Sequence, residues 1–380
     1  MSNAEEIYDV AVVGGGLAGL TLSIQSAKAG FKTILFEKEN YPFHKVCGEY
    51  ISLESLPFLK QLGLPVEEFN LPFIKKLQLT DAKGKLFEFD LPLGGFGISR
   101  YKLDNALYEI AKAKGVHVLT NRKVTDIIFD VAAFTIQTGD KNFKSKIVAG
   151  AFGKRSNIDI KWKRDFIKTK PGKLNNYIGI KYHIRYPYPK DHIALHNFSD
   201  GYCGISNIED DKCCLCYLTT ANNLKSNNNS IPEMEKNVLF QNPVLKEIFS
   251  TAEFLYKEPL VISQVSFNKK RQVEDHVLMV GDAAGLITPL CGNGMSMAMH
   301  ASKLAFENIH AFLQNKIDRN QMEDNYTREW QQHFSKRLWM GRMVQHLFGN
   351  NTSTGLFLSV MHSVPWLAKQ VIRSTHGEVF

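Results

Sequence analysis

The chain has 380 residues, of which 44% are hydrophobic and 22% are charged, and its formal net charge is +8. This composition is ordinary for a globular protein of two or three domains. Six cysteines in so long a chain favour a reducing compartment, and there is neither a signal-peptide pattern nor an uninterrupted apolar stretch of about 18 residues. We therefore expect a cytoplasmic protein, either free or peripheral to a membrane.

The positive charge is partly local. A basic patch can attract nucleic acid, anionic lipid or a phosphorylated ligand. No RNA- or DNA-binding motif accompanies this one, so we interpret it as a solvated face and expect no nucleic-acid partner. The clustered residues are Lys161, Lys163, Arg164, Lys168, Lys170 and Lys173.

The first elements form a β–α–β unit. Residues 8–13 are a short apolar run that ends in glycines, residues 17–29 have helical spacing up to Gly30, and residues 32–37 are a second strand. A crossover of this length is what a parallel pair of strands requires.

The later elements divide into strand-rich and helical parts. We expect helices at 55–62, 103–114 and 293–313, and a mostly helical tail over 322–372. Strands are expected at 75–91 as a hairpin, 117–119, 123–129, 135–148 as a hairpin, 177–186, 192–198, 201–219 as a hairpin, and 277–280.

The glycine turn after the first strand contains G-x-G-x-x-G. Gly14 permits a tight turn, Gly16 lets a pyrophosphate approach the backbone, and Gly19 lets the helix pack closely on the sheet. The helix N-terminus, with Leu17 and Ala18, offers free N–H groups to the phosphates. The turn thus predicts a dinucleotide site, for either NAD or FAD.

An acidic residue at the end of the second strand supports this site. Glu37 follows Gly19 by eighteen residues, which matches the acidic partner of a ribose hydroxyl pair. A carboxylate there also disfavours a 2′-phosphate, because two like charges would meet. We expect the neighbouring Lys38 to contact the cofactor as well.

A second glycine-rich segment distinguishes the two cofactors. A strand ends at Gly281-Asp282, Pro289 precedes Gly292-Asn293-Gly294, and a long helix follows. This segment resembles the FAD "GD" motif of the glutathione-reductase-2 superfamily, which includes para-hydroxybenzoate-hydroxylase-like monooxygenases, flavin-dependent halogenases and geranylgeranyl reductases. The resemblance implies that Asp282 bonds the ribityl chain and that Gly292 to Met295 lie beside the flavin ring, where helix N–H groups would favour reduced flavin.

Three further matches extend the resemblance to about Leu313. Lys45, Cys47 and Gly48 are similar to the K-x-C-G segment of geranylgeranyl-reductase-like members, which runs past the flavin. Arg100 resembles the family arginine near the pyrophosphate and ribityl, and Val124 the residue whose backbone meets adenine. The implied fold class is α/β, with a Rossmann-like FAD-binding domain, an antiparallel β-sheet substrate domain and a helical C-terminal tail.

The expected domains are discontinuous. We assign the FAD-binding domain to residues 1–74, 96–157 and 265–315, the substrate domain to 75–95 and 158–264, and the helical segment to 316–380.

The chain departs from the family pattern in two places. Phe152 stands where many members carry the acid of G-A-D-G-x-x-S, which puts direct handling of NAD(P)H in doubt. The tryptophan motif W-x-W-x-I-P of flavin halogenases is absent, which disfavours a halogenase.

Candidate catalytic groups stay open at this stage. Cys47 and Cys291 could donate a proton or line the pocket, and His44 could donate a proton, although an exposed loop histidine is the more common outcome. Cys213, Cys214 and Cys216 alternate along a strand without a C-x-x-C pair, so we expect no metal site. We assign no catalytic residue.

The tail is rich in large apolar side chains. It could line a tunnel for an apolar substrate or touch a membrane surface, although core packing or a dimer contact is more common. These residues are Trp339, Met340, Met343, Leu347, Phe348, Leu356, Phe357, Leu358, Met361, Trp366 and Leu367.

The resemblance implies an FAD-dependent oxidoreductase with an apolar small-molecule substrate. We expect reduction of a carbon–carbon double bond of an isoprenoid or lipid-like substrate. The alternatives are a monooxygenase that hydroxylates an aromatic or polyketide substrate through a flavin C4a-hydroperoxide, and a non-catalytic flavin-binding redox sensor. The electron donor, NAD(P)H or another, stays open.

Overall fold

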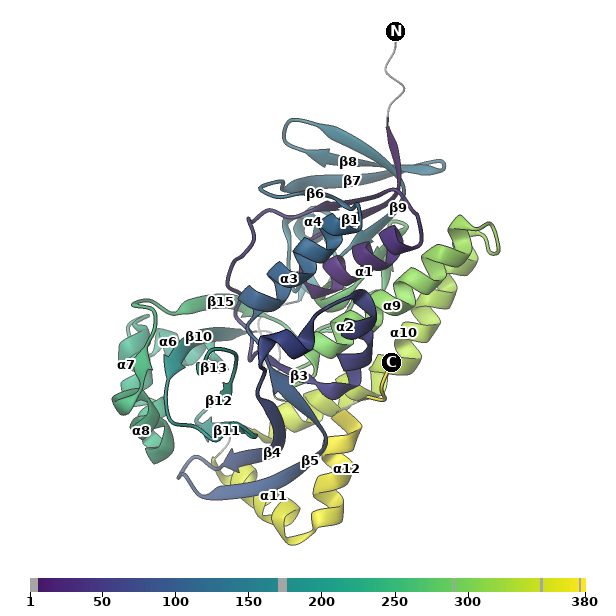
Figure 1. Ribbon diagram of the computed structural model, residues 1–380. Helices are drawn as coiled ribbons and strands as arrows, with labels where there is room; N and C mark the ends of the chain where they lie inside the picture. Colours follow the sequence, from purple (N-terminus) through teal and green to yellow (C-terminus); the bar gives the residue numbers. More distant parts are fainter. Residues whose placement is uncertain (1–5, 170–175, 289, 291, 349–350, 376) are drawn as a thin grey trace.

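The computed structural model describes residues 6–169, 176–288, 290, 292–348, 351–375 and 377–380 (Figure 1). Within these ranges the chain forms two large β-sheets with helices around them. Pro289 and Cys291 lie outside the described residues, as do Lys170 and Lys173 of the predicted basic patch.

The first sheet has a parallel core with the strand order β16-β17-β9-β1-β2-β6. Its central strands are buried runs of branched aliphatic residues, as expected where helices or strands cover both faces. An antiparallel extension, β7 and β8, pairs with β9. The strands are β1 (Ile7–Val13), β2 (Thr33–Phe36), β6 (His117–Leu119), β7 (Val124–Asp130), β8 (Ala133–Thr138), β9 (Asn142–Gly150), β16 (Val273–Glu274) and β17 (Val277–Met279).

Three helices pack together beside this sheet: α1 (Leu17–Lys28), α3 (Arg100–Ala113) and α9 (Gly294–Leu313). The hydroxyl groups of Thr21 on α1 and Ser302 on α9 form a buried hydrogen bond of 2.7 Å. This contact joins the two glycine-rich segments, which are almost 300 residues apart in the sequence.

The second sheet has the order β14-β10-β13-β12-β11-β4-β5-β3, with β15 also paired to β10. All its pairs are antiparallel except β4 with β11. Its strands are β3 (Tyr50–Ser52), β4 (Phe73–Thr80), β5 (Leu86–Gly97), β10 (Tyr177–Arg185), β11 (His192–Phe198), β12 (Gly201–Asn207), β13 (Cys213–Thr220), β14 (Glu253–Phe254) and β15 (Leu260–Val265).

Short helices cover one face of the second sheet. Met234, Leu245 and Ile248 pack on Cys213, Leu215 and Tyr217 of β13 in a separate hydrophobic core. These helices have no counterpart among the elements expected from the sequence; they are α6 (Ala221–Lys225), α7 (Ile231–Asn237) and α8 (Pro243–Thr251). The other short helices are α2 (Leu56–Leu62), α4 (Asn157–Lys161) and α5 (Asp165–Lys168).

The C-terminal part is helical, as predicted. It comprises α10 (Arg319–Leu347), α11 (Asn351–Ser363) and α12 (Pro365–Thr375). Helix α10 packs on α9, whereas α11 and α12 pack against β5 at the lower end of the molecule (Figure 1). Among the described helices, none combines the length and the apolar character needed to cross a bilayer.

The structure confirms the predicted fold class and adds three corrections. The second sheet is not purely antiparallel, because β4 joins β11 in parallel. Strand β3 belongs to the second sheet, although its residues fall in the range assigned to the first domain. Arg164 of the basic patch is not on a solvated face, because it is 3% exposed and its guanidinium lies 2.8 Å from the Asp159 carboxylate.

Candidate active site

The first glycine turn opens onto a large cavity. Gly14 has φ +108°, and a side chain at Gly19 would collide with the Gly14 carbonyl oxygen at 1.9 Å. A Cβ at Gly16 would instead point into open space, with the amino group of Lys45 at 3.7 Å and the guanidinium of Arg100 at 3.8 Å. The turn therefore forms a cradle beside two cations, as a pyrophosphate requires.

Glu37 is buried and holds the glycine turn in place. Its carboxylate accepts hydrogen bonds from the backbone N–H groups of Gly15, at 2.8 Å, and Glu39, at 3.1 Å. A carboxylate has about four acceptor positions, so it can also accept from ribose hydroxyls. Lys38, at the exposed rim, and Val124, at the start of β7, line the cavity nearby.

The second glycine-rich segment reaches the same cavity. Gly281 has φ +63°, and its Cβ position lies 3.0 Å from Ala18 on α1. Gly292 has φ +65° and faces the ring of Tyr50. Helix α9 begins at Gly294, so its free N–H groups and positive dipole end lie at the cavity wall.

Asp282 lies on the cavity wall, close to the amino groups of Lys270 and Lys154. Burial raises the pKa of its carboxyl above the ordinary range, while the charges of Lys270, Arg100 and Lys154 oppose that rise. Burial also lowers the pKa of Lys154 to about 8, against the opposing effect of Asp282. Asp282 is thus a buried hydrogen-bonding group that faces the cavity between positive charges.

Arg100 is fixed by a residue that the sequence analysis missed. Its guanidinium forms two hydrogen bonds of 2.7 Å with the buried Asp104, one turn later on α3. Lys45 approaches the same carboxylate at 3.1 Å. Burial would raise the pKa of Asp104, but these two cations outweigh it and hold that pKa below its usual range. The i,i+4 spacing of Arg100 and Asp104 was the available signal.

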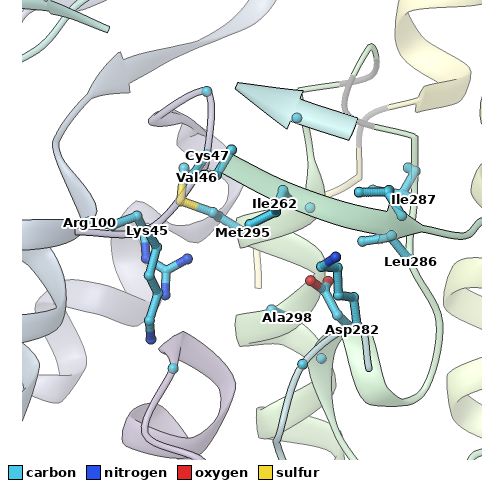
Figure 2. Close-up of a pocket in the computed structure, with 18 of the residues that line it drawn as sticks. Lys45, Val46, Cys47, Arg100, Ile262, Asp282, Leu286, Ile287, Met295 and Ala298 are labelled. Carbon is cyan, nitrogen blue, oxygen red and sulfur yellow. The ribbon is translucent and has the colours of Figure 1, made fainter. Parts of the chain in front are cut away.

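The Lys45–Gly48 segment runs along one wall of the cavity. Figure 2 shows Lys45, Cys47 and Arg100 on one side, and Asp282, Leu286 and Ile287 on the other. Burial raises the pKa of the Cys47 thiol, so this group keeps its proton at neutral pH. The Cys214 thiol from β13 donates to the Cys47 carbonyl at 3.2 Å.

Behind this segment lies a buried charge cluster that the sequence analysis did not find. Glu49 is fully buried; its carboxylate forms an ion pair with Lys181 and lies 2.6 Å from His183 Nε2. It also accepts from the backbone N–H of Arg100 at 2.8 Å. Burial would raise the pKa of Glu49, but Lys181 and His183 outweigh it and hold that pKa below its ordinary value.

A sequence signal for the cluster existed in β10. Lys181 and His183 alternate with isoleucine and tyrosine in the buried part of the strand, which places both on one face. Nothing in the sequence indicated that Glu49, more than 130 residues earlier, would meet them.

Glu49, His183 and Cys214 also form a group of potential metal ligands, with ligand atoms within 4.8 Å of one another. The Lys181 ammonium contacts the same carboxylate, so a metal cation would meet a positive charge there. Burial also keeps the pKa of the Cys214 thiol well above its ordinary value, whereas a metal requires the thiolate. This arrangement favours the prediction of a metal-free site.

His44 is not the exposed loop residue that the sequence analysis favoured. It is half-buried, stacks on Tyr101 with ring centroids 4.6 Å apart, and lies 3.0 Å from the hydroxyl of Tyr256. Burial, His183 and Lys181 lower the pKa of His44 to about 4. The imidazole is therefore neutral at neutral pH, and His44 is a poor proton donor.

The cavity has a volume of about 1130 Å³, which exceeds the roughly 300–1,000 Å³ usual for one small-molecule site. Beyond the glycine turns it continues as an apolar arm between the second sheet and the C-terminal helices. The arm is lined by Leu77, Leu79, Leu91, Ile193, Leu195, Leu218, Val344, Phe348, Phe357, Met361, Val371 and Ile372.

Tyr50 stands where the two parts of the cavity meet. Its ring lies against Gly292 on one side and packs with Ile74, Leu91 and Ile372 on the other. Its buried hydroxyl has no hydrogen-bond partner among the described residues, and burial raises its pKa. The Tyr50 hydroxyl is therefore protonated at neutral pH, as is the Cys47 thiol.

The structure brings together nearly all the residues predicted to bind the cofactor. Gly19 and Asn293 do not line the cavity. Gly19 packs α1 against the Gly14 carbonyl, and Asn293 is the residue that precedes α9. The predicted residues that line it are Gly14, Gly16, Leu17, Ala18, Glu37, Lys38, Lys45, Cys47, Gly48, Arg100, Val124, Gly281, Asp282, Gly292, Gly294 and Met295.

A glycine cradle with two cations, an acidic residue beyond the second strand and a helix N-terminus define the class of dinucleotide-binding flavoproteins. The model of the FAD binding domain family matches residues 7–338, and the chain belongs to this family. It is an FAD-dependent oxidoreductase, as the sequence resemblance implied.

Curated relatives span most of the chain at low identity. Conditioned medium factor receptor 1 of Dictyostelium discoideum is 25% identical over 90% of this chain and 71% of its own length. A digeranylgeranylglycerophospholipid reductase of Methanococcus vannielii is 26% identical over 89% of this chain and 86% of its own.

Solved structures share the fold. A flavin-dependent brominase has a TM-score of 0.78 and 20% identity, covering 97% of this chain and 93% of its own. A geranylgeranyl bacteriochlorophyll reductase-like protein of Thermoplasma acidophilum has a TM-score of 0.75 and 20% identity, covering 90% and 88%. Because proteins of different activities share this fold, the reaction must be argued from the site.

Proposed function

We propose that the chain reduces a carbon–carbon double bond of an apolar, isoprenoid or lipid-like substrate. The observation that carries this proposal is the continuity of the cavity. Its polar end has the features of an FAD site, and its other end is an arm lined by aliphatic and aromatic side chains. A long hydrocarbon gains free energy from burial in such an arm, at about 25 cal/mol per Å² of apolar surface.

The cofactor-binding residues are part of the proposal. Gly16, Lys45, Arg100 and the start of α1 would hold the pyrophosphate, and Glu37 the ribose. Asp282 and the N-terminus of α9 would hold the ribityl and the flavin ring. When bound, FAD supplies a hydride, and the side chains around it orient the substrate and exclude water.

A double-bond reduction also needs a proton, and two groups of the chain can supply it. Cys47 and Tyr50 both line the cavity, and burial raises the pKa of the Cys47 thiol and of the Tyr50 hydroxyl. We favour Tyr50, because its hydroxyl has no partner among the described residues and its ring also contacts the apolar arm.

The names of the relatives support this substrate class. The Methanococcus vannielii relative is named a digeranylgeranylglycerophospholipid reductase, and its match covers most of both chains. The cavity also argues against the redox-sensor alternative, because it extends well beyond the glycine turns.

The test is reduction of a lipid under anaerobic conditions. Chemically reduced holoprotein is mixed with a geranylgeranyl lipid, and the product is analysed by mass spectrometry. We expect the gain of two hydrogens per reacted bond, with flavin reoxidation that the fully saturated lipid does not cause. Hydroxylation of an aromatic substrate in air, with no anaerobic saturation, would instead establish the monooxygenase alternative.

A further inference from the structure

Helices α11 and α12 are apolar on two opposite faces. Their inner face carries Leu358, Met361 and Ile372, which are buried and pack against the second sheet or the cavity. Their outer face carries Leu356 and Trp366, which are 68% and 69% exposed. A helix that serves only to close a cavity is expected to be polar on its solvent side.

The exposed apolar residues of the chain are concentrated here. Of the sixteen large hydrophobic side chains that are exposed among the described residues, six fall between Trp339 and Trp366. Leu356, Val360 and Val364 follow one another at intervals of four residues, so they form one stripe that leads to Trp366. Such a patch marks an interaction surface.

Along this stretch of the sequence the charged residues have one sign. From residue 330 to residue 377 the chain has no Asp or Glu, but five Lys or Arg residues. Lys369 and Arg373 are exposed on α12, three and seven residues after Trp366, and therefore share its face. Apolar residues and a tryptophan flanked by Lys and Arg are the composition of helices that bind at membrane surfaces.

We propose that this docking face, formed by Leu356, Val360, Val364, Trp366, Lys369 and Arg373, binds the surface of an anionic lipid bilayer. The apolar stripe and Trp366 insert at the level of the headgroups, while the two cations contact lipid phosphates. The docked helices are the ones whose inner residues, Phe357, Met361 and Val371, line the apolar arm. Docking thus puts the arm directly above the hydrocarbon.

A second copy of the chain fits this face less well. In a symmetric dimer the same patch lies on both subunits, so the interface would hold Lys369 and Arg373 twice, without a carboxylate from residues 330–377. Like charges placed together across an interface oppose association, whereas an anionic bilayer neutralises them. The net charge of +8 likewise opposes self-association and favours binding to an anionic bilayer.

Co-sedimentation of the full-length holoprotein with lipid vesicles tests the proposal. Vesicles of phosphatidylcholine alone are compared with vesicles that also contain phosphatidylglycerol. We expect binding to the anionic vesicles, weakened by salt, and a blue shift of tryptophan fluorescence as Trp366 enters the interface. The double variant Lys369→Gln/Arg373→Gln should bind about thirtyfold more weakly, since each cation near the surface contributes roughly a factor of five.

Matched variants keep the test specific. Leu356→Ser/Trp366→Ser should lose vesicle binding, whereas Val131→Ser, at a fully exposed apolar residue on the β7–β8 turn, should not. Unchanged thermal midpoints and FAD absorbance verify that each variant is folded. The proposal is overturned if wild type does not bind anionic vesicles, if the docking-face variants bind as well as wild type, or if light scattering finds a dimer that Leu356→Ser/Trp366→Ser dissociates.

Discussion

The two ends of the cavity are built in different ways. The cofactor end is made mainly of backbone: glycines at 14, 16, 281 and 292 remove side chains from the wall, and α1 and α9 present N–H groups. The apolar arm is made of side chains from β4, β5, β11 and β13 and from the three C-terminal helices.

This difference predicts different responses to mutation. Where the wall is made of backbone, replacing a glycine by a larger residue should weaken ligand binding, because the new side chain keeps the ligand away from the backbone. A wall of aliphatic side chains tolerates the replacement of one apolar residue by another of similar volume. A replacement of different volume mainly changes which ligand shapes the cavity accepts. The buried cluster around Glu49 lies behind the Lys45–Gly48 segment and should behave like neither end.

The largest effect that we expect is a loss of stability when the charge cluster around Glu49 is broken. Lys181→Met leaves the Glu49 carboxylate buried without its cation, which we expect to lower the free energy of unfolding by about 3–5 kcal/mol. Urea denaturation followed by circular dichroism measures the loss. The double variant Glu49→Gln/Lys181→Met removes both charges and should recover much of it; a loss below about 1 kcal/mol in Lys181→Met would contradict the prediction.

The same cluster should make the stability of the protein depend on pH in the acidic range. The pKa of Glu49 in the folded chain lies below 4.5, so its stabilising effect is present above pH 4.5 and is lost as the pH falls through the folded-state pKa. The urea midpoint should therefore fall more steeply below pH 4.5 in wild type than in Glu49→Gln. Parallel curves for the two proteins would show that Glu49 does not contribute.

The second effect tests the junction of the two ends. If Tyr50 donates the proton, Tyr50→Phe should lower the rate of double-bond reduction about 100-fold, because general acid catalysis contributes at least that much. FAD binding should not change, since the ring is retained. Cys47→Ala is the matched comparison: full activity in Tyr50→Phe with a large loss in Cys47→Ala would assign the proton to the thiol.

The third effect tests the backbone-built end. In Gly16→Val the new side chain occupies the open space beside Lys45 and Arg100, so we expect the dissociation constant of FAD to rise at least tenfold, about 1.4 kcal/mol. Titration of the apoprotein with FAD measures it. Gly139→Val, whose Cβ would meet nothing within 4 Å, is the control. Equal affinity in the two variants would place the pyrophosphate elsewhere.

The smallest effect tests the apolar arm. Leu195→Trp narrows the arm, and we expect KM for a long isoprenoid to rise about fivefold, near 1 kcal/mol, with FAD binding unchanged. Leu195→Met, of similar volume, should differ little from wild type. An unchanged KM for the long substrate in Leu195→Trp would mean that the chain of the substrate does not enter this arm.

The sequence by itself determined the parts of this protein that depend on neighbouring residues. The β1–α1–β2 unit, Glu37, the Gly281-Asp282 pair and the start of α9 could be predicted because each combines local geometry with local chemistry at fixed spacing. Phe152 and the K-x-C-G segment likewise needed only a few consecutive residues. Even the apolar character of the tail was visible, although not which of its faces is buried.

Only the tertiary structure decided the contacts between distant segments. Glu49 meets Lys181 and His183 because β10 lies behind the loop after Gly48, and the phenol of Tyr50 reaches Gly292 because β3 pairs with β5. The inner and outer faces of α11 and α12 exist only once these helices pack on β5. Local patterns specify elements and turns, but charge pairing and burial depend on which segments the whole fold brings into contact.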